Sequence, residues 1–421
     1  MHVVARNSDV KRTRIAPHPP HPPYVRTAPK RELDTSTPVF ILGGKENSLS
    51  ITRHLGALNI EVFCSGPATC WGMYSRFCAK RYPVPGSGSL KSYWHELLLG
   101  PNSHGHHGKI ILPCCDEAIE FVAENHEELS VNYIIEEASA DQRLAFLHKQ
   151  RTLELARDAG IGFPKFWKIS SPSGLDGIKD DIQYPVMVKP FNTVQFAKVF
   201  GRKLFIVESG FDELLKRVTQ AHAANQAVMI VEMIPGPDSQ LSSYYTYIDP
   251  QGEPLFHFTK RVWRRYPVNR GGATFHSTRW LPETAALGLR FFQQTGFRGL
   301  GNIEFKFDTR DGQLKIIEVN ARFTAAQELA LRAGVPIDLI TYCHLTGQSL
   351  PKVKKYRNGL NYLYLLRDIM AFRQLRSRGE MTFADWIKSL RSGAIVSPLH
   401  KSNDLLPTIM AGVAILRKAL R

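Results

Sequence analysis

The stretch "GNIEFKFDTRDGQLKIIEVNAR", residues 301–322, constrains this chain more than any other part of it. Apolar and polar residues alternate on both sides of "TRDG", a pattern typical of two half-buried strands joined by a hairpin turn. Successive side chains of a strand point to opposite faces, so Glu304 lies on the face away from the apolar residues. On the second strand, Glu318 and Asn320 share a face. The sequence therefore predicts a hairpin that carries acidic and amide side chains together.

The turn predicts how these side chains meet. An odd-numbered loop centred on Asp311 places Glu304 opposite Glu318, with their Cβ atoms about 5 Å apart. Two carboxylates at that distance repel, and a hard cation with oxygen ligands relieves the repulsion, with Asn320 as a neutral ligand. Mg²⁺ typically takes one or two carboxylates and completes its shell with phosphate and water. We therefore interpret the hairpin as a nucleotide–metal site.

A second interpretation makes the hairpin purely structural. Lys306 shares the face of Glu304, and Lys315 lies on the neighbouring strand, so both could neutralise the acids on a solvated surface. The hairpin alone does not distinguish the two interpretations. The remaining motifs of the chain favour the metal site.

The 421 residues are enough for two or three domains, and they divide into four parts by composition. Residues 1–37 are rich in Pro, His and Arg, which predicts a disordered basic extension. Residues 38–135 alternate buried strands with amphipathic helices, which predicts a small doubly wound, Rossmann-like domain. Residues 136–350 are dominated by strands, and residues 351–421 are basic and helical in pattern.

Two details of this organisation can be checked in a structure. A single helix is expected from Asp141 to about Ala159, where Gly160 stops it. The turn after the first strand has Gly43 and Gly44 but no G-x-G-x-x-G spacing, so the sequence gives little support for a dinucleotide site.

The formal net charge of +16 is concentrated at the ends of the chain. Lys and Arg outnumber the acids by ten in residues 352–421, and most of the remaining excess lies in the N-terminal extension. The apolar run "LLPTIMAGVAIL", residues 405–416, is too short to span a membrane. We expect a packed terminal helix there or, as the alternative, peripheral contact with anionic lipid helped by Arg417, Lys418 and Arg421.

The cysteines and the N-terminus predict a compartment. The six cysteines form no C-x-x-C pair, and a chain of this length needs no disulfides to be stable. The N-terminus has no apolar run like that of a signal peptide. We therefore expect a cytoplasmic protein with reduced cysteines.

Residues 38–350 resemble the ATP-grasp superfamily, and in particular the carboxylate–amine ligases related to D-aspartate ligase and to the large subunit of carbamoyl phosphate synthase. The resemblance lies in "YPVMVKPFN", "IVEMIPGPD" and "IIEVNAR", in that order. It implies the ATP-grasp fold, of α/β and α+β class. The parts would be an N-terminal Rossmann-like (pre-ATP-grasp) domain, two lobes with the nucleotide between them, and a helical C-terminal appendage.

The resemblance also implies the residues that handle metal and phosphate. "IIEVNAR" is similar to the metal strand of the family, which implies Glu318 and Asn320 as metal ligands together with Glu304. Arg322 would be the catalytic residue that counters charge during phosphoryl transfer. "YPVMVKPFN" is similar to the strand whose lysine contacts the α and β phosphates, here Lys189.

The adenosine contacts are implied in the same way. "IVEMIPGPD" looks like the linker between the two lobes, where adenine docks. Glu232 and the backbone of Met233 and Ile234 would contact the base. Asp238 would contact the ribose hydroxyls.

The chain departs from the family pattern in two places. "HKQRTLELARDAGIGFP" resembles the helix with a second phosphate lysine, Lys149, but His148 stands where the family usually has Asp. The stretch that resembles the glycine-rich lid loop, "NTVQFAKVFGRK", has only Gly201. This lid would use its backbone and the side chains Gln195, Lys198 or Lys203.

The implied reaction uses ATP with Mg²⁺, or with Mn²⁺ as an alternative. A small-molecule carboxylate attacks the γ-phosphorus to give an acyl phosphate, and an amine or similar nucleophile then displaces phosphate. In the strand "TKRVWRRYP", Arg261 or Arg264 could hold the acyl phosphate, and an ordinary basic strand is the alternative.

Two other functions stay open on the sequence. One is anionic-surface or nucleic-acid binding on an ATP-grasp scaffold, through "KRVWRRY" and the basic C-terminus. The other is a non-catalytic ATP-binding regulatory subunit, against which the intact metal ligands argue. We expect no nucleic-acid partner, and we leave the oligomeric state open, with a homodimer as one option.

Overall fold

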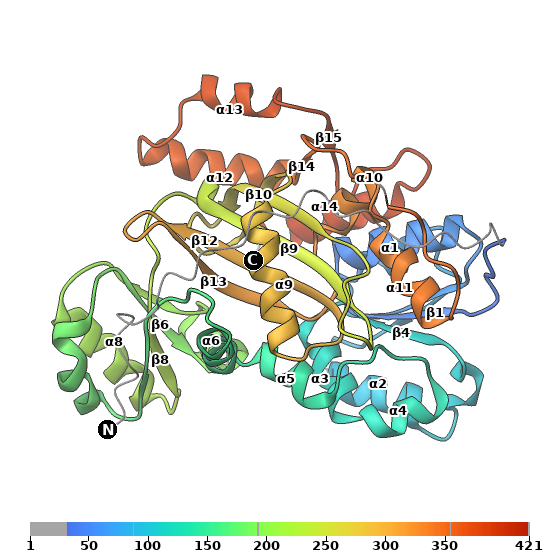
Figure 1. Ribbon diagram of the computed structural model, residues 1–421, viewed down its shortest axis with the longest axis horizontal. Coiled ribbons are helices and arrows are strands. Elements are labelled where there is room, and N and C mark those ends of the chain that lie inside the picture. The colour runs from blue at the N-terminus through green and yellow to red at the C-terminus, as the bar shows by residue number, and fades with distance from the viewer. Residues whose placement is uncertain (1–31, 87, 192, 354, 420–421) are drawn as a thin grey trace.

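The computed structural model describes residues 32–86, 88–191, 193–353 and 355–419. Most of the predicted N-terminal extension lies outside the described residues, and its last part, residues 32–37, is tied to the body of the protein. There, the Tyr342 hydroxyl donates to the backbone oxygens of Asp34 and Thr37. Three β-sheets organise the described chain (Figure 1).

The first sheet is parallel and has the strand order β3-β2-β1-β4. Both faces of β1 are buried, because Val39 and Ile41 pack toward α1 while Phe40 and Leu42 pack toward α2 and α3. The predicted Rossmann-like unit is thereby confirmed. Its elements are β1 (Val39–Leu42), α1 (Glu46–Ala57), β2 (Val62–Gly66), η2 (Trp71–Tyr74), β3 (Lys80–Pro83), α2 (Leu90–Leu99), η3 (Ser103–His106), β4 (Ile110–Pro113), α3 (Asp116–Glu124) and α4 (His126–Asn132).

The turn between β1 and α1 packs tightly against the start of α3. Gly43 and Gly44 have φ angles of +70° and +85°, in the left-handed region that favours glycine. A Cβ atom on Gly43 would stand 2.3 Å from the sulfur of Cys115. Asp116, the next residue, therefore lies at the carboxyl edge of the parallel sheet, where ligands of such sheets bind.

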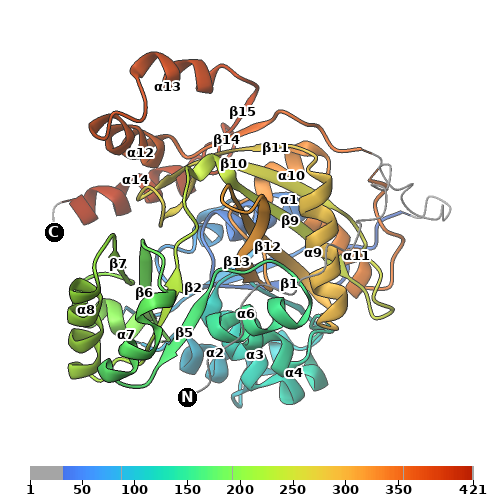
Figure 2. The ribbon, with the colours of Figure 1, turned by 60° about the vertical axis from the view of Figure 1, so that its left-hand side comes forward.

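The second sheet is antiparallel, with the order β5-β8-β6-β7, and forms a small lobe beside β12 and β13 (Figures 1 and 2). The single helix predicted from Asp141 to Ala159 is wrong: the chain breaks at His148, which has extended backbone angles. The first half packs on α3, both halves contact β13, and the two halves pack against each other across the turn. The elements are α5 (Ala140–Leu147), α6 (Lys149–Asp158), β5 (Phe166–Ile169), η4 (Pro172–Asp181), β6 (Val186–Pro190), α7 (Thr193–Phe200), β7 (Phe205–Val207), α8 (Phe211–Ala223) and β8 (Val228–Glu232).

The central sheet has seven strands in the order β13-β12-β9-β10-β11-β14-β15, all antiparallel except the pair β14–β15. Helix α9 packs on one face through Phe291 and Phe292, which share a core with Tyr244 and Ile303. The other face packs toward α1, α10 and α11. The elements up to α11 are η5 (Asp238–Gln240), β9 (Leu241–Ile248), β10 (Phe258–Tyr266), β11 (Gly272–Thr278), α9 (Pro282–Gln294), β12 (Gly299–Asp308), β13 (Gln313–Asn320), α10 (Gln327–Ala333) and α11 (Ile337–Leu345).

The C-terminal region contains the predicted helices and also completes the central sheet. Its elements are β14 (Asn361–Leu363), α12 (Leu365–Ser377), α13 (Phe383–Leu390), β15 (Ile395–Val396) and α14 (Leu406–Ala419). Asp368 of α12 forms an ion pair with Arg264 of β10, and Asp404 forms one with Arg53 of α1, each at 2.8 Å. These buried ion pairs fix the C-terminal region to the central sheet and to the Rossmann-like unit. No helix in the described part of the chain has the length and apolar character needed to cross a membrane.

Candidate nucleotide and metal site

The β12–β13 hairpin places the two predicted acidic ligands side by side. Glu304 is the cross-strand partner of Glu318, and Asn302 is the partner of Asn320. The amide nitrogen of Asn320 donates to Asn302 at 3.3 Å, which leaves the oxygen of the Asn320 amide as an acceptor. The three predicted metal ligands therefore share one face of the hairpin.

The hairpin reaches this arrangement by a different loop from the one predicted. Asp308 pairs with Gln313, so the loop has four residues rather than an odd number, although Gly312 does adopt the expected left-handed conformation, with φ +70°. A bulge at Ile317 shifts the register by one residue, and this restores the pairing of Glu304 with Glu318. The predicted pairing is confirmed, and the reason given for it is wrong.

The charges around Glu318 are those expected at a cation-binding site. Glu318 is exposed, yet desolvation of its carboxylate by the surrounding atoms raises its pKa. The charges of Glu304 and Asp116 raise that pKa further, while Arg322 and Lys189 lower it. Two facing carboxylates, together with an amide oxygen, are a donor set that suits Mg²⁺.

The structural alternative for this hairpin is not supported. Lys306 turns away from the acids and donates to the backbone oxygens of Ile234 and Gly236, at 2.9 and 2.7 Å. Lys315 pairs with Asp308 and Asp311, at 2.7 and 2.8 Å. Both lysines are thus held by other partners, and they do not neutralise Glu304 and Glu318.

Lys189 projects from β6 toward the hairpin. It shares a face with Met187, which packs in one cluster with Leu153 of α6 and Ile316 of β13. Burial lowers the pKa of Lys189 to about 8; the charge of Lys149 lowers it as well, and Glu318 opposes the shift. The predicted phosphate lysine is thus placed beside the predicted metal ligands.

Lys149, the first residue of α6, belongs to the same neighbourhood. Burial lowers its pKa, Glu318 and Asp116 oppose this, and Lys203 adds to it. The structure therefore brings Lys149 and Lys189 close to one acidic hairpin, with Lys203 near Lys149. A metal–polyphosphate would suit these surroundings, because its phosphates would pair with the lysines and its metal ion with the carboxylates.

Arg322 is held by a residue that the sequence analysis did not single out. Its Nε and Nη2 atoms both contact Asp116 Oδ1, at 2.7 Å. Burial alone would lower the pKa of Arg322, but Asp116 and Glu318 raise it. Asp116 could have been found from its position directly after β4, at the carboxyl edge of the parallel sheet.

The predicted adenosine contacts lie on the segment that follows β8. Glu232 pairs with Arg310 at 2.7 Å and accepts the backbone N–H of Lys165. The N–H of Met233 donates to the backbone oxygen of Pro185, just before β6, and the oxygen of Ile234 accepts from Lys306 of β12. The segment is therefore held between the two lobes, and its contacts with adenine stay a prediction.

Asp238, the predicted ribose contact, has partners within the chain. Its carboxylate pairs with Arg265 at 2.7 Å and accepts the backbone N–H of Asn269 at 3.3 Å. A ribose hydroxyl would have to bind this carboxylate alongside these contacts, and this role stays a prediction.

The predicted lid is a helix rather than a loop. Helix α7 forms because Phe196 and Phe200, one turn apart, both pack against Phe205 of β7, with ring centroids 5.1 Å from it. Gly201 ends the helix with φ +65°. Of the three side chains predicted for the lid, Lys203 is the one whose charge acts on a phosphate lysine, and Lys198 is exposed on α7.

Arg264, one of two arginines considered for the acyl phosphate, has a structural role. It is buried and bonds through Nε and Nη2 to both carboxylate oxygens of Asp368, at 2.9 and 2.8 Å. It therefore ties β10 to α12 rather than facing a substrate.

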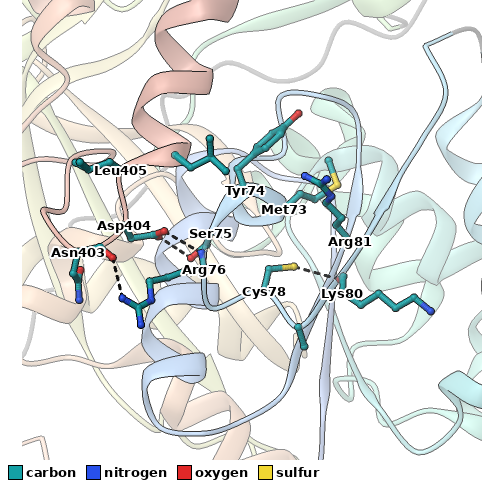
Figure 3. Close-up of a pocket in the computed structure, with 12 residues that line it drawn as sticks. Met73, Tyr74, Ser75, Arg76, Cys78, Lys80, Arg81, Asn403, Asp404 and Leu405 are labelled. Atoms are coloured by element: carbon teal, nitrogen blue, oxygen red, sulfur yellow. Dashed lines mark hydrogen bonds between the residues drawn. The ribbon is translucent and has the colours of Figure 1, made fainter.

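A separate cavity of about 580 Å³ lies between η2, β3 and the start of α14 (Figure 3). None of the predicted site residues lines it. Its lining residues are Met73, Tyr74, Ser75, Arg76, Cys78, Ala79, Lys80, Arg81, Asn403, Asp404, Leu405 and Leu406.

Known proteins match both the motif and the fold. Residues 279–352 match the family described as carbamoyl-phosphate synthase L chain, ATP binding domain. This stretch contains the four residues Glu304, Glu318, Asn320 and Arg322.

The chain is also 24% identical over 229 residues to D-aspartate ligase from Enterococcus faecium (strain Aus0004). That match covers 51% of this chain and 53% of the relative, so it spans about half the length of each.

Two solved structures show the fold at low identity. One is the biotin carboxylase domain dimer of the 2-oxoglutarate carboxylase of Hydrogenobacter thermophilus, in complex with MgADP, ADP and bicarbonate: TM-score 0.59, 16% identity, 76% of this chain and 73% of that chain covered. The other is L-amino acid ligase from Bacillus licheniformis: TM-score 0.57, 15% identity, 77% and 79% covered. At such identities the likeness shows the fold alone, and the predicted ATP-grasp fold is confirmed.

Proposed function

From its ATP-grasp fold, we propose that this chain is a carboxylate–amine ligase that binds Mg-ATP between the small lobe and the central sheet. One observation carries the proposal. Glu304 and Glu318 face each other across the β12–β13 hairpin, in the electrostatic field of Lys189 and Arg322.

The metal would be held by three oxygen ligands. Glu304 and Glu318 offer carboxylates and Asn320 an amide oxygen, and the remaining ligands would come from phosphate and water. Across the described residues, no group of three or more His, Cys, Asp or Glu side chains is arranged to hold an ion on its own. When bound, Mg²⁺ would neutralise phosphate charge and orient the transferred phosphoryl group.

The cationic side chains would position the phosphates. Lys189 and Lys149 approach from the small lobe and from α6, and each is already near Glu318. Arg322 presents a planar guanidinium whose orientation is fixed by Asp116. Such pre-placed charges stabilise the transition state without having to reorganise during the reaction.

The reaction would then run in two steps without a covalent enzyme intermediate. A carboxylate oxygen of the substrate forms a bond to the γ-phosphorus, the bond from that phosphorus to the β–γ bridging oxygen breaks, and ADP leaves. The amine nitrogen next attacks the acyl carbon, the bond from that carbon to the phosphate oxygen breaks, and the released phosphate can accept the proton that the nitrogen loses. Two relatives are named as ligases of amino acids, which supports an amino acid as one substrate.

The test traps the acyl phosphate, so that the natural amine need not be known. Purified protein is incubated with Mg-ATP, hydroxylamine and one carboxylate at a time from a panel of amino acids, dicarboxylates and bicarbonate. We expect ADP release and hydroxamate formation that both require Mg²⁺ and one of the carboxylates. Tight ATP binding without hydroxamate from any carboxylate would instead support the non-catalytic regulatory subunit.

We also propose that the face around the cavity in Figure 3 contacts anionic membrane lipid. Three exposed cations, Arg76, Lys80 and Arg81, line the cavity. Asp404, the acid in its lining, is buried and bonded to Arg53 and Ser75, so it does little to offset them.

Apolar side chains stand next to these cations. Leu405, Leu406 and Ile409 at the start of α14 are 48%, 48% and 57% exposed. Aliphatic groups beside cations suit an acyl–headgroup boundary, whereas nucleic acid would favour aromatic platforms. This observation favours a lipid surface over nucleic acid.

Vesicle sedimentation tests this second proposal. The protein should bind vesicles containing phosphatidylglycerol and not pure phosphatidylcholine, and Ile409→Glu or Arg81→Glu should each weaken binding about 10-fold. Val131→Glu, at an exposed valine of α4, is the control. Binding to RNA with no preference for anionic vesicles would contradict the proposal.

A further inference from the structure

A row of polar side chains runs across the central sheet, starting at the metal hairpin. Glu304 of β12 is opposite Ser243 of β9, which is opposite Lys260 of β10. His276 of β11 is opposite Val262, which lies on the same face as Lys260, and it is also opposite Tyr362 of β14. Cross-strand partners share a face, so all of these side chains lie on the face that carries Glu304.

This row is buried. Lys260 is 3% exposed, and His276 and Tyr362 are each 1% exposed. Polar groups in that position are nearly always hydrogen-bonded in folded proteins. Here the Nε2 atom of His276 and the hydroxyl of Tyr362 have no hydrogen-bond partner among the residues that the structure describes.

The contacts within the row define what it offers to a ligand. Lys260 Nζ lies 3.5 Å from Nδ1 of His276, and the His276 and Tyr362 rings stack with centroids 4.4 Å apart. An ammonium group only donates, so Nδ1 of His276 is the acceptor. Burial keeps the pKa of His276 well below its usual value, so the neutral ring carries its one proton on Nε2.

The row therefore presents donors: the ammonium of Lys260, the Nε2–H of His276 and the hydroxyl of Tyr362. Among the acids near Tyr362, Glu328 is offset by Arg332 at 2.8 Å, and Glu46 lies at the start of α1. A protonated substrate amine would bring further hydrogen-bond donors to groups that already act as donors. A carboxylate would accept from Nε2 of His276 and from the Tyr362 hydroxyl, with the charge of Lys260 beyond Nδ1 of the same imidazole ring.

We propose that Lys260, His276 and Tyr362 form a recognition pocket for a carboxylate group of the substrate, on the same face of the sheet as the metal ligands. The pocket rests on the proposed function, since it would hold the acidic substrate beside the nucleotide. These three residues would determine the preference for an acidic substrate over the corresponding amide. Lys260 supplies the charge, while His276 and Tyr362 supply the directional donors.

A role in ligand binding and a structural role predict opposite effects of removing these groups. A buried polar group that serves the fold has a partner, and its loss destabilises the protein. A buried polar group that has a partner only when ligand is bound destabilises the ligand-free protein. Its removal therefore leaves the stability of the ligand-free protein unchanged or raises it. Tyr362→Phe removes only the hydroxyl and Lys260→Met only the charge, so both keep the packing.

The experiment measures ligand binding and stability separately, without ATP turnover. Small mono- and dicarboxylates, each paired with its amide analogue at equal ionic strength, are titrated into the wild type by calorimetry, and ligand-free melting temperatures are recorded. The variants are Tyr362→Phe and Lys260→Met. Tyr342→Phe is the matched control, since the Tyr342 hydroxyl donates to two backbone oxygens.

We expect at least one acid to bind more tightly than its amide, and both variants to weaken that acid at least 10-fold while Mg-ATP affinity stays within about 2-fold. Melting temperatures should hold or rise in the two variants and fall in Tyr342→Phe. Acid affinity that is equal to amide affinity in the wild type, or unchanged in the variants, overturns the pocket. Absence of hydroxamate with acid binding intact would count against the ligase and not against the pocket.

Discussion

Glu304 of β12 is the direct cross-strand neighbour of Glu318 of β13, and a bulge at Ile317 makes it so. Without the extra residue, the regular register of the hairpin would pair Glu304 with Ile317 and turn Glu318 to the other face of the sheet. The bulge therefore brings two like charges together, in a fold that could have kept them apart. Such an arrangement is costly for the ligand-free protein and useful only when a cation joins it.

The repulsion at the hairpin should be visible in the stability of the ligand-free protein. Burial and Glu304 raise the pKa of Glu318 above its usual value. An acid whose pKa is raised by folding loses stabilising effect as pH rises through its ordinary range and above. Glu318→Gln should therefore raise the melting temperature at pH 7 by about 1–3 °C and leave it unchanged near pH 4.

Differential scanning calorimetry at the two pH values measures this effect. Glu213→Gln, at an exposed carboxylate of α8, is the control and should change neither value. A lower melting temperature for Glu318→Gln at pH 7 would mean that Glu318 has a stabilising partner within the chain.

Lys189 should make ATP binding depend on pH. Burial lowers its pKa to about 8, so the ligand-free side chain is largely neutral above that pH. Phosphate favours the protonated form, so ATP binding at pH 8.5 should take up protons, and ATP affinity should fall as pH rises from 7 to 9. Lys189→Met should weaken ATP roughly 10- to 100-fold and abolish most of the proton uptake.

Titration calorimetry in buffers of different ionisation enthalpy reads the proton uptake directly. Lys168→Met, at an exposed lysine of β5 in the same lobe, is the matched control. An unchanged ATP affinity in Lys189→Met would remove Lys189 from the site.

The contact between Arg322 and Asp116 should affect turnover more than folding. Asp116 is 61% exposed, so Asp116→Asn should leave the melting temperature within about 1 °C. Arg322 would then be less well oriented, and turnover should fall roughly 10-fold with little change in the KM for ATP. Glu120→Gln, on an exposed turn of the same helix, is the control for steady-state kinetics. Equal loss of kcat and melting temperature would indicate a structural contact.

Asp368 should be important for stability and unimportant for nucleotide binding. Its carboxylate accepts from Arg264, Thr274 and Trp386 in the buried junction between the central sheet and the C-terminal helices. Asp368→Ala leaves the charge of Arg264 buried without its partner, which costs about 3–5 kcal/mol. Chemical denaturation should show this loss, whereas Asp385→Ala, at the exposed N3 position of the α13 capping box, should cost much less. Loss of ATP affinity in a folded Asp368→Ala protein would contradict a purely structural role.

Much of the fold and of the site could be predicted from local patterns. Glu304, Glu318 and Lys189 lie in strands whose alternation and motifs can be recognised from a few residues, and the structure brings these three together. Strands of the ATP-grasp core were predicted for the same reason.

What could not be predicted depends on contacts between distant segments. Asp116 approaches Arg322 from the start of α3, and the break at His148 lets α5 and α6 pack against each other while α5 also packs on α3. Likeness to a family loop predicts a loop for the lid, whereas the spacing of Phe196 and Phe200 favours a helix. The β14 strand is too short to be recognised without its neighbour β11.

The central claim is that Glu304 and Glu318 hold the metal of Mg-ATP, and the Mg²⁺ dependence of ATP binding tests it most directly. Calorimetry would compare ATP affinity with and without Mg²⁺ in the wild type, Glu304→Gln, Glu318→Gln and the control Glu213→Gln. We predict that Mg²⁺ strengthens ATP binding at least 10-fold in the wild type and the control, and less than 2-fold in the two hairpin variants. A hairpin variant that folds and keeps the full Mg²⁺ dependence would contradict the account.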